Sequence, residues 1–140
     1  MKKLPLLLVL WLLCPWAYGQ DHKATVDQFF ELVHCQEVLS RGFMGIEAFV
    51  ASQKEALFKE YELDVHNPTD VATFDSLLHE RMQMFERNAY VRLHERYVYD
   101  YPPEQVEGYL ALANGSSEED ILRASNFRQE VDSLITYFQP

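Results

Sequence analysis

The chain has few cysteines and lacks the short motifs that carry catalysis or cofactor binding. It holds two cysteines, Cys14 and Cys35, and no Cys-x-x-Cys pair. There is no Gly-x-Ser-x-Gly elbow and no glycine-rich phosphate loop. The His-Glu pairs that begin at His79 and His94 lack the second histidine of a His-Glu-x-x-His zinc motif. These absences predict a protein that is not an enzyme and that holds no cofactor.

Basic residues are also scarce. The 12 lysines and arginines face 22 aspartates and glutamates, which gives a formal net charge of −10 at pH 7. Nucleic acids and anionic lipids both need a basic protein surface, so this charge argues against either as a partner. A solvated acidic surface is the simplest consequence of the composition.

No hydrophobic run is long enough to span a membrane. Two lysines precede an apolar run from Leu4 to Leu13, about ten residues where a span needs roughly twenty. Ala17-Tyr18-Gly19 then fits a signal-peptidase site. A lipoprotein signal at Cys14 is the alternative, disfavoured because a leucine precedes that cysteine. We predict a cleaved signal peptide over 1–19, a periplasmic or secreted location, and no stable membrane insertion after cleavage.

Cleavage would leave Cys35 as the single cysteine, so residues 20–140 would contain no internal disulfide. Cys35 shares one side of a predicted helix with Leu32 and Leu39. Free cysteine is among the most buried residue types, so we predict a buried thiol. An intermolecular disulfide or a reactive thiol is the alternative.

Hydrophobic periodicity predicts helices throughout the chain. The longest pattern runs from Thr73 to Tyr101, and its apolar residues recur every three or four positions: Phe74, Leu78, Met82, Phe85, Ala89 and Leu93. We expect a central helix from Pro68, capped by Asn67, to Tyr99. A break near Thr73 and a strand over 97–101 are the alternatives. A second apolar row is expected to widen the buried stripe: Leu77, Met84, Val91 and Val98.

The other segments predict partners for this helix. A first helix should begin at Thr25 and stop at Arg41-Gly42, although a kinked helix through that point is possible. Three more helices are expected over 44–61, over 103–113 with a left-handed stop at Asn114-Gly115, and from Ser116 or Ser117 to about Phe138. The predicted fold is all-α, a single small bundle of about five helices over 20–140.

The last part of the chain resembles a known group of proteins. Its features are an aromatic helix end at Tyr97, a turn with Pro103-Glu104, a helix with Tyr109-Leu110 and a Gly/Ser break before a closing amphipathic helix. In these it is similar to small exported bacterial helical proteins grouped as a domain of unknown function. The resemblance implies a helical architecture and an envelope location, and it implies no activity.

One stretch combines arginines with tyrosines in an otherwise acidic chain. We call it the arginine–tyrosine surface; its candidate binding residues are Arg81, Arg87, Arg92, Arg96, Tyr90 and Tyr97. Arginine and tyrosine are favoured at interaction surfaces, so this stretch predicts binding of an acidic protein partner or an anionic ligand in the cell envelope. The alternative interpretation is that these arginines neutralise carboxylates on neighbouring helices.

A second functional hypothesis is a bundle that binds a metal or a small ligand between helices. Glu31-x-x-His34 supplies one half of a di-iron carboxylate motif, and a histidine of the central helix would have to complete the site. One half of a two-part motif is not sufficient for us to predict a metal site.

Overall fold

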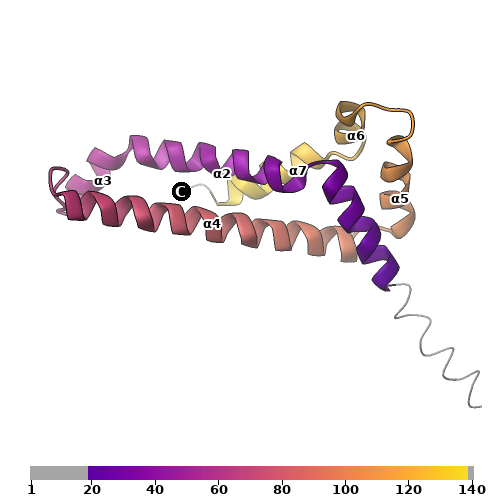
Figure 1. Cartoon of the computed structure of the whole chain (residues 1–140), viewed down its shortest axis with the longest axis horizontal. Helices are drawn as coiled ribbons and strands as arrows, with labels where there is room; N and C mark the ends of the chain where they lie inside the picture. Colours follow the sequence, from indigo (N-terminus) through magenta and orange to yellow (C-terminus); the bar gives the residue numbers. More distant parts are fainter. Residues whose placement is uncertain (1–18, 139–140) are drawn as a thin grey trace, which may run out of the picture. The chain divides into compact units, whose positions relative to one another are not determined.

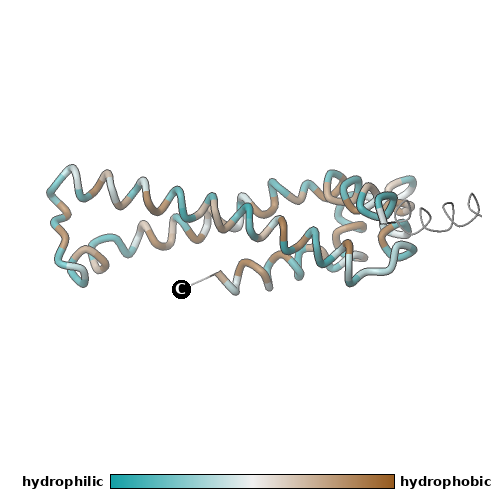
Figure 2. Tube along the Cα trace, turned by 90° about the horizontal axis from the view of Figure 1, so that it is seen from below, coloured by the Kyte–Doolittle hydropathy of each residue, from teal (hydrophilic) through white to brown (hydrophobic). Residues whose placement is uncertain are grey.

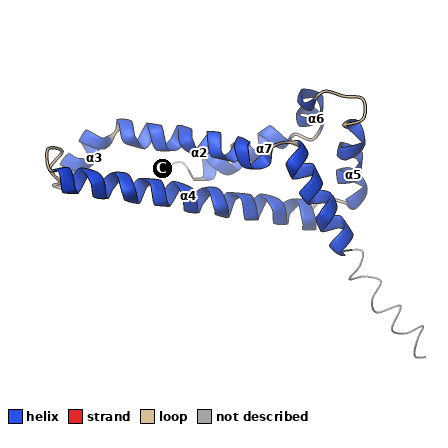
Figure 3. Ribbon diagram, in the orientation of Figure 1, coloured by secondary structure: helices blue, strands red, loops and turns tan. Residues whose placement is uncertain are grey.

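A computed structural model describes residues 19–138, and these residues form helices and loops without a strand (Figures 1 and 3). The predicted all-α class is therefore confirmed. The described residues contain seven helices instead of about five: 19–32, α2 (Cys35–Ser52), α3 (Lys54–Glu60), α4 (Pro68–Tyr99), α5 (Pro103–Leu112), α6 (Glu118–Ala124) and α7 (Phe127–Tyr137). The predicted signal peptide lies almost wholly outside the described residues and stays a prediction.

The central helix α4 begins and ends where the sequence predicted. It runs from Pro68 to Tyr99 without a break, so the strand alternative over 97–101 is wrong. The Asn67 side-chain oxygen accepts a hydrogen bond from the Thr69 backbone N–H at 2.9 Å, which caps the helix. Pro102 follows in extended conformation and Pro103 starts α5, since a proline excludes the preceding residue from helical geometry.

The first helical segment is divided at a different place from the one predicted. The predicted stop at Arg41-Gly42 is wrong, because α2 continues through both residues. The break lies at Val33-His34, where His34 adopts a left-handed conformation with φ 50°. A side chain at Gly42 would overlap the side chain of Ile135 in α7, so this glycine permits close helix packing and does not end a helix.

Two further helix boundaries differ from the predicted ones. Thr25 does not start a helix, because helix 19–32 runs through it and its hydroxyl donates to the Asp21 carbonyl at 2.9 Å. The predicted left-handed stop at Asn114-Gly115 is also wrong, since neither residue has a positive φ. The chain leaves α5 through a turn over 113–115 instead.

The last predicted helix is two helices. Asn126, with φ 51°, separates α6 from α7. A capping box starts α6 at Ser117, one of the two predicted starts. The Ser117 hydroxyl accepts from the Asp120 N–H at 3.2 Å, and the Asp120 carboxylate accepts from the Ser117 N–H at 3.3 Å. The Ser117 hydroxyl also donates to the Asp120 carboxylate at 2.7 Å, and this bond, together with that from the Ser117 N–H, lowers the pKa of Asp120.

The helices belong to two compact units, whereas the sequence offered no boundary within 20–140. Unit 1 contains helix 19–32, the end of α4 from His94, α5 and α6; unit 2 contains α2, α3, α4 up to Leu93, and α7. The chain passes between them three times. Two of the passages are at the left-handed residues His34 and Asn126, and the third is inside α4.

Aromatic rings form the centre of unit 1. Tyr97 is fully buried, with its ring centroid 5.3 Å from those of Phe29 and Phe30. His94 Nε2 lies 2.6 Å from Asp27 Oδ1. The aliphatic part of this core is Val26, Val33, Val106, Ile121 and Leu122. Helix 19–32 supplies three of these residues to the core: Val26, Phe29 and Phe30.

Unit 2 is a helical hairpin, α2 and α3 running back along α4, with α7 beside α2 (Figure 1). Its buried residues are Cys35, Leu39, Phe43, Ile46, Phe58, Met82, Ala89, Leu93, Phe127 and Val131. The prediction of a buried Cys35 is confirmed, and burial raises the pKa of its thiol to about 12. Figure 2 shows hydrophobic and hydrophilic residues alternating turn by turn along these helices.

The second apolar row of α4 widens the buried stripe only in part. Met84 and Val98 are half-buried, whereas Leu77 and Val91 are 56% and 52% exposed. The two exposed residues lie on the side of the helix away from Met82 and Ala89, and no other described helix of unit 2 covers them. None of the described helices is long and apolar enough to cross a membrane.

Candidate functional site

The six residues of the arginine–tyrosine surface all lie on α4, but they do not belong to one surface. Arg81, Arg87, Tyr90 and Arg92 are in unit 2, whereas Arg96 and Tyr97 are in unit 1. A helix turns by about 100° per residue, so Arg87 and Arg92 point about 140° apart around the axis. The spacing in sequence therefore overstated how closely the six side chains gather.

Tyr97 is removed from the candidate site. It is 0% exposed, its ring stacks on that of Tyr101 at 4.4 Å between centroids, and it also contacts Phe29. A residue in the centre of the core cannot touch a partner at the surface. The prediction of Tyr97 as a surface binding residue is wrong, because tertiary packing placed helix 19–32 over this side of α4.

Arg92 is engaged within its own unit. Its guanidinium carbon lies 5.7 Å from the Tyr137 ring centroid and 5.9 Å from that of Phe138, which is cation–π geometry. This arginine thus helps to hold the end of α7 against α4. Its role in packing accounts for its place in the sequence without an external ligand.

Arg87 and Tyr90 line a groove between α2 and α4 with a volume of about 410 Å³. Its complete lining is Gln36, Leu39, Glu86, Arg87, Tyr90 and Val91. Leu39 is buried, Glu86 and Tyr90 are half-buried, and Gln36 and Arg87 are exposed. The groove therefore has an apolar floor with polar groups above it, which is a common composition for a binding site.

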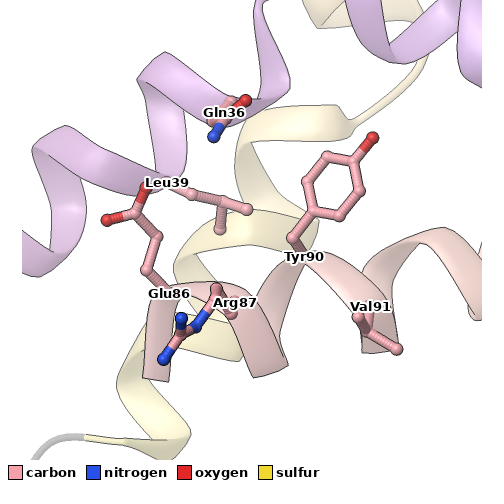
Figure 4. Close-up of a pocket in the computed structure, with 6 residues that line it drawn as sticks. All are labelled: Gln36, Leu39, Glu86, Arg87, Tyr90 and Val91. Carbon is pink, nitrogen blue, oxygen red and sulfur yellow. The ribbon is translucent and has the colours of Figure 1, made fainter. Parts of the chain in front are cut away.

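Figure 4 shows how these side chains are arranged. Leu39, Glu86 and Tyr90 extend into the space between the two helices, whereas Arg87 and Val91 lie at the outer edge of α4. The guanidinium is thus at the rim, where a bound partner could reach it without entering the groove.

The charge of Arg87 is not balanced nearby. Within residues 19–138 no carboxylate oxygen lies within 4.0 Å of its guanidinium, and the same holds for Arg81. The interpretation that the arginines neutralise carboxylates on neighbouring helices is therefore not supported for these two. Arg87 differs from Arg81 in one respect, because only Arg87 borders the groove.

Neither a protein-family model, nor a curated protein, nor a solved structure matches this chain. The resemblance of its last part to small exported helical proteins accordingly stays a prediction.

The residues of the metal hypothesis do not form a site. Glu31 and His34 are both exposed and belong to different units. In the described part of the chain, no group of three histidine, cysteine, aspartate or glutamate side chains is close enough to hold a metal ion. His79 lies instead 3.5 Å from Glu47 and 3.0 Å from Gln83, as a link between α2 and α4.

Four residues of the groove were not predicted from the sequence. Gln36, Leu39 and Glu86 carry no motif, and only the packing of α2 on α4 brings them to Arg87. Val91 did carry a signal in the sequence, since it belongs to the second apolar row of α4, which was expected to be buried. An apolar residue that stays exposed beside an unpaired arginine is visible only in the folded chain.

Proposed function

We propose that this chain is an exported, non-enzymatic helical protein that binds a partner protein at the groove between α2 and α4. Arg87 and Tyr90 are its anchoring residues. The observation that carries the proposal is an exposed arginine without an ion pair in the described chain, at the rim of a groove with an apolar floor. Arginine and tyrosine are, with tryptophan, the residue types enriched among the side chains that dominate binding energies.

The chemistry of the groove favours a peptide segment that carries a carboxylate. Arg87 can form two parallel hydrogen bonds to a carboxylate, which gives both energy and orientation. The Gln36 amide and the Tyr90 hydroxyl can exchange hydrogen bonds with a peptide backbone, while Leu39 and Val91 contact an apolar side chain. Glu86 adds a negative charge inside the groove, so a uniformly acidic segment would be repelled there.

Site-specific photo-crosslinking in the intact cell tests this proposal. A photoreactive amino acid at Gln36, on the groove, is compared with one at Glu107, an exposed residue of α5 outside it. We expect a defined adduct from position 36 and none from position 107. The adduct should disappear in Arg87→Glu and persist in Arg81→Glu.

The two arginine variants form a matched pair. Both replace an exposed arginine of α4 without an ion pair in the described chain, and both change the net charge by the same amount. Neither should alter the helical circular-dichroism signal. An adduct that forms equally in both variants, or equally from both crosslinker positions, would show that the groove is not the binding surface.

A small organic ligand is the second candidate function. The groove volume of about 410 Å³ falls within the range of small-molecule sites, about 300–1,000 Å³. Native mass spectrometry of the purified protein tests it. A bound mass that is retained by Arg81→Glu and lost by Arg87→Glu would favour this candidate over a protein partner.

A further inference from the structure

Among the helices of residues 19–138, none covers one end of the unit 2 hairpin. In Figures 1 and 2, α7 runs beside the half of α2 further from α3 and ends well before the hairpin turn. Its last aromatic contacts are those of Phe138 with Phe43 and Phe85, at 5.8 and 5.2 Å between ring centroids. We call residues 49–78, beyond these contacts, the open end.

The surface that α7 covers continues into the open end. Phe49 lies seven residues after Gly42, which packs against Ile135 of α7, and therefore on the same face of α2 two turns further along. Leu78 lies seven residues before Phe85 and likewise shares its face of α4. Phe49 is 58% exposed, whereas the corresponding Gly42 is half-buried.

Apolar exposure is concentrated in this part of the molecule. The open end contains one buried residue, Phe58, and five large hydrophobic residues that are at least 37% exposed: Phe49, Tyr61, Leu63, Val65 and Leu77. Singly exposed apolar residues are ordinary, but a group at one end of a hairpin, with Phe49 in line with α7, indicates a surface for another helix.

The open end is also acidic, which indicates what could cover it. Residues 49–78 hold six carboxylates and two lysines, a net charge of 2 − 6 = −4. One of the lysines, Lys54, is already paired with Asp75 at 2.8 Å. At the turn the two properties interleave, because Tyr61, Leu63 and Val65 alternate with Glu60, Glu62 and Asp64. Arg81, one turn beyond Leu77, limits the acidic region on the α4 side.

We infer that the open end binds an amphipathic helical segment of a partner protein that carries lysines or arginines beside its apolar face. The apolar face would continue the packing of α7 over Phe49 and Leu78, and the basic residues would meet the carboxylates of the turn. A second copy of this chain fits less well, since two acidic ends would repel each other. This surface is separate from the groove at Arg87 and does not depend on the function proposed there.

Fluorescence anisotropy with three labelled synthetic peptides tests the inference on the full chain. The first peptide is an 18-residue amphipathic helix of leucine, alanine and lysine. The second has the same composition in an order without helical periodicity, and the third has glutamate in place of lysine. We expect the first to bind at least about tenfold more tightly than the second, and the third not to bind, because both shape and charge must match.

One variant and one control locate the site. Phe49→Asp should weaken binding of the first peptide at least about tenfold, since it places a charge in the apolar surface. Tyr99→Asp alters an 81% exposed residue of unit 1 and should leave the affinity within about twofold. All altered side chains are exposed, so circular dichroism should show an unchanged fold.

Three results would overturn the inference. Equal binding of the first two peptides would mean that charge alone attracts them. An affinity unaffected by Phe49→Asp would place binding elsewhere. Light scattering that shows a dimer, with a monomer for Phe49→Asp, would identify a second copy of the chain as the occupant.

Discussion

The two halves of the unit 2 hairpin use the same helices differently. Beside α7, Phe43 and Ile46 of α2 are 1% and 5% exposed; one to two turns further on, Phe49 is 58% exposed. The residue types are alike, and the difference is whether a neighbouring helix lies against the side chain. An apolar stripe on a helix is thus buried only where another element packs against it. Where the stripe extends beyond that element, its side chains are exposed.

The largest test of this comparison is truncation of an aromatic side chain in each half. Phe43→Ala should lower the free energy of unfolding by about 3–5 kcal/mol, because it leaves a cavity beside Phe138. Phe49→Ala, on the same helix, should change it by less than about 1 kcal/mol. Urea unfolding followed by circular dichroism measures both. Equal losses would mean that the open end is as well packed as the covered half.

Two glycines of α2 sharpen the comparison at the level of close packing. Gly42→Leu should destabilise the protein by about 1–3 kcal/mol, because the new side chain overlaps Ile135. Gly45→Leu meets nothing within 4 Å of its Cβ and should be neutral or stabilising by up to about 1 kcal/mol, as helix propensity improves. Thermal unfolding of the two variants would show them shifting in opposite directions. A similar loss of stability in both variants would mean that the cost comes from the helix backbone and not from overlap with α7.

The buried thiol predicts a specific sensitivity to alkali. Burial raises the pKa of Cys35 from 9.0 to about 12, so above pH 9 the unfolded chain releases a proton that the folded chain keeps. Stability contributed by this group is present below pH 9 and is lost as pH rises towards 12. Between pH 8 and pH 10 the loss should be about 1 kcal/mol. Urea midpoints of Cys35→Ala should fall less over this range than those of the unaltered chain; parallel curves would refute the assignment.

The smallest predicted effect separates the arginines of α4. Arg92→Ala removes the stacking on Tyr137 and Phe138 and should cost about 0.5–1 kcal/mol of stability. Arg81→Ala removes no ion pair within the described chain and should stay within about 0.5 kcal/mol of the unaltered protein. Precise thermal melts can resolve the pair. Equal losses of stability in the two variants would mean that Arg92 does not help to hold α7.

Much of the local structure was predictable because its determinants are close in sequence. Asn67-Pro68 and Pro102-Pro103 bound α4, and the Ser117–Asp120 box starts α6, through bonds that span two or three residues. The break at Arg41-Gly42 was wrong for the opposite reason. A glycine that ends a helix and one that admits a neighbouring helix look the same until Ile135 is placed.

The candidate site likewise combines features that the sequence predicted with features that only tertiary packing determines. Composition was enough to select Arg87 and Tyr90 as candidate binding residues. It also selected Tyr97, which is buried in the core, and Arg92, which contacts Tyr137 of α7. Helical periodicity tells which side chains share a direction; it does not tell which direction another helix will occupy. The partners Gln36 and Leu39, about fifty residues away in the chain, follow only from packing.

The sequence by itself determined that this protein is helical, acidic and dependent on packing in place of disulfides within 20–140, because periodicity, charge and cysteine count are properties of the chain alone. Only the tertiary structure decided which apolar stripes are core and which are surface. The reason is physical: hydrophobic side chains are buried by whatever lies against them, and α7 is long enough to cover one half of the hairpin and not the other.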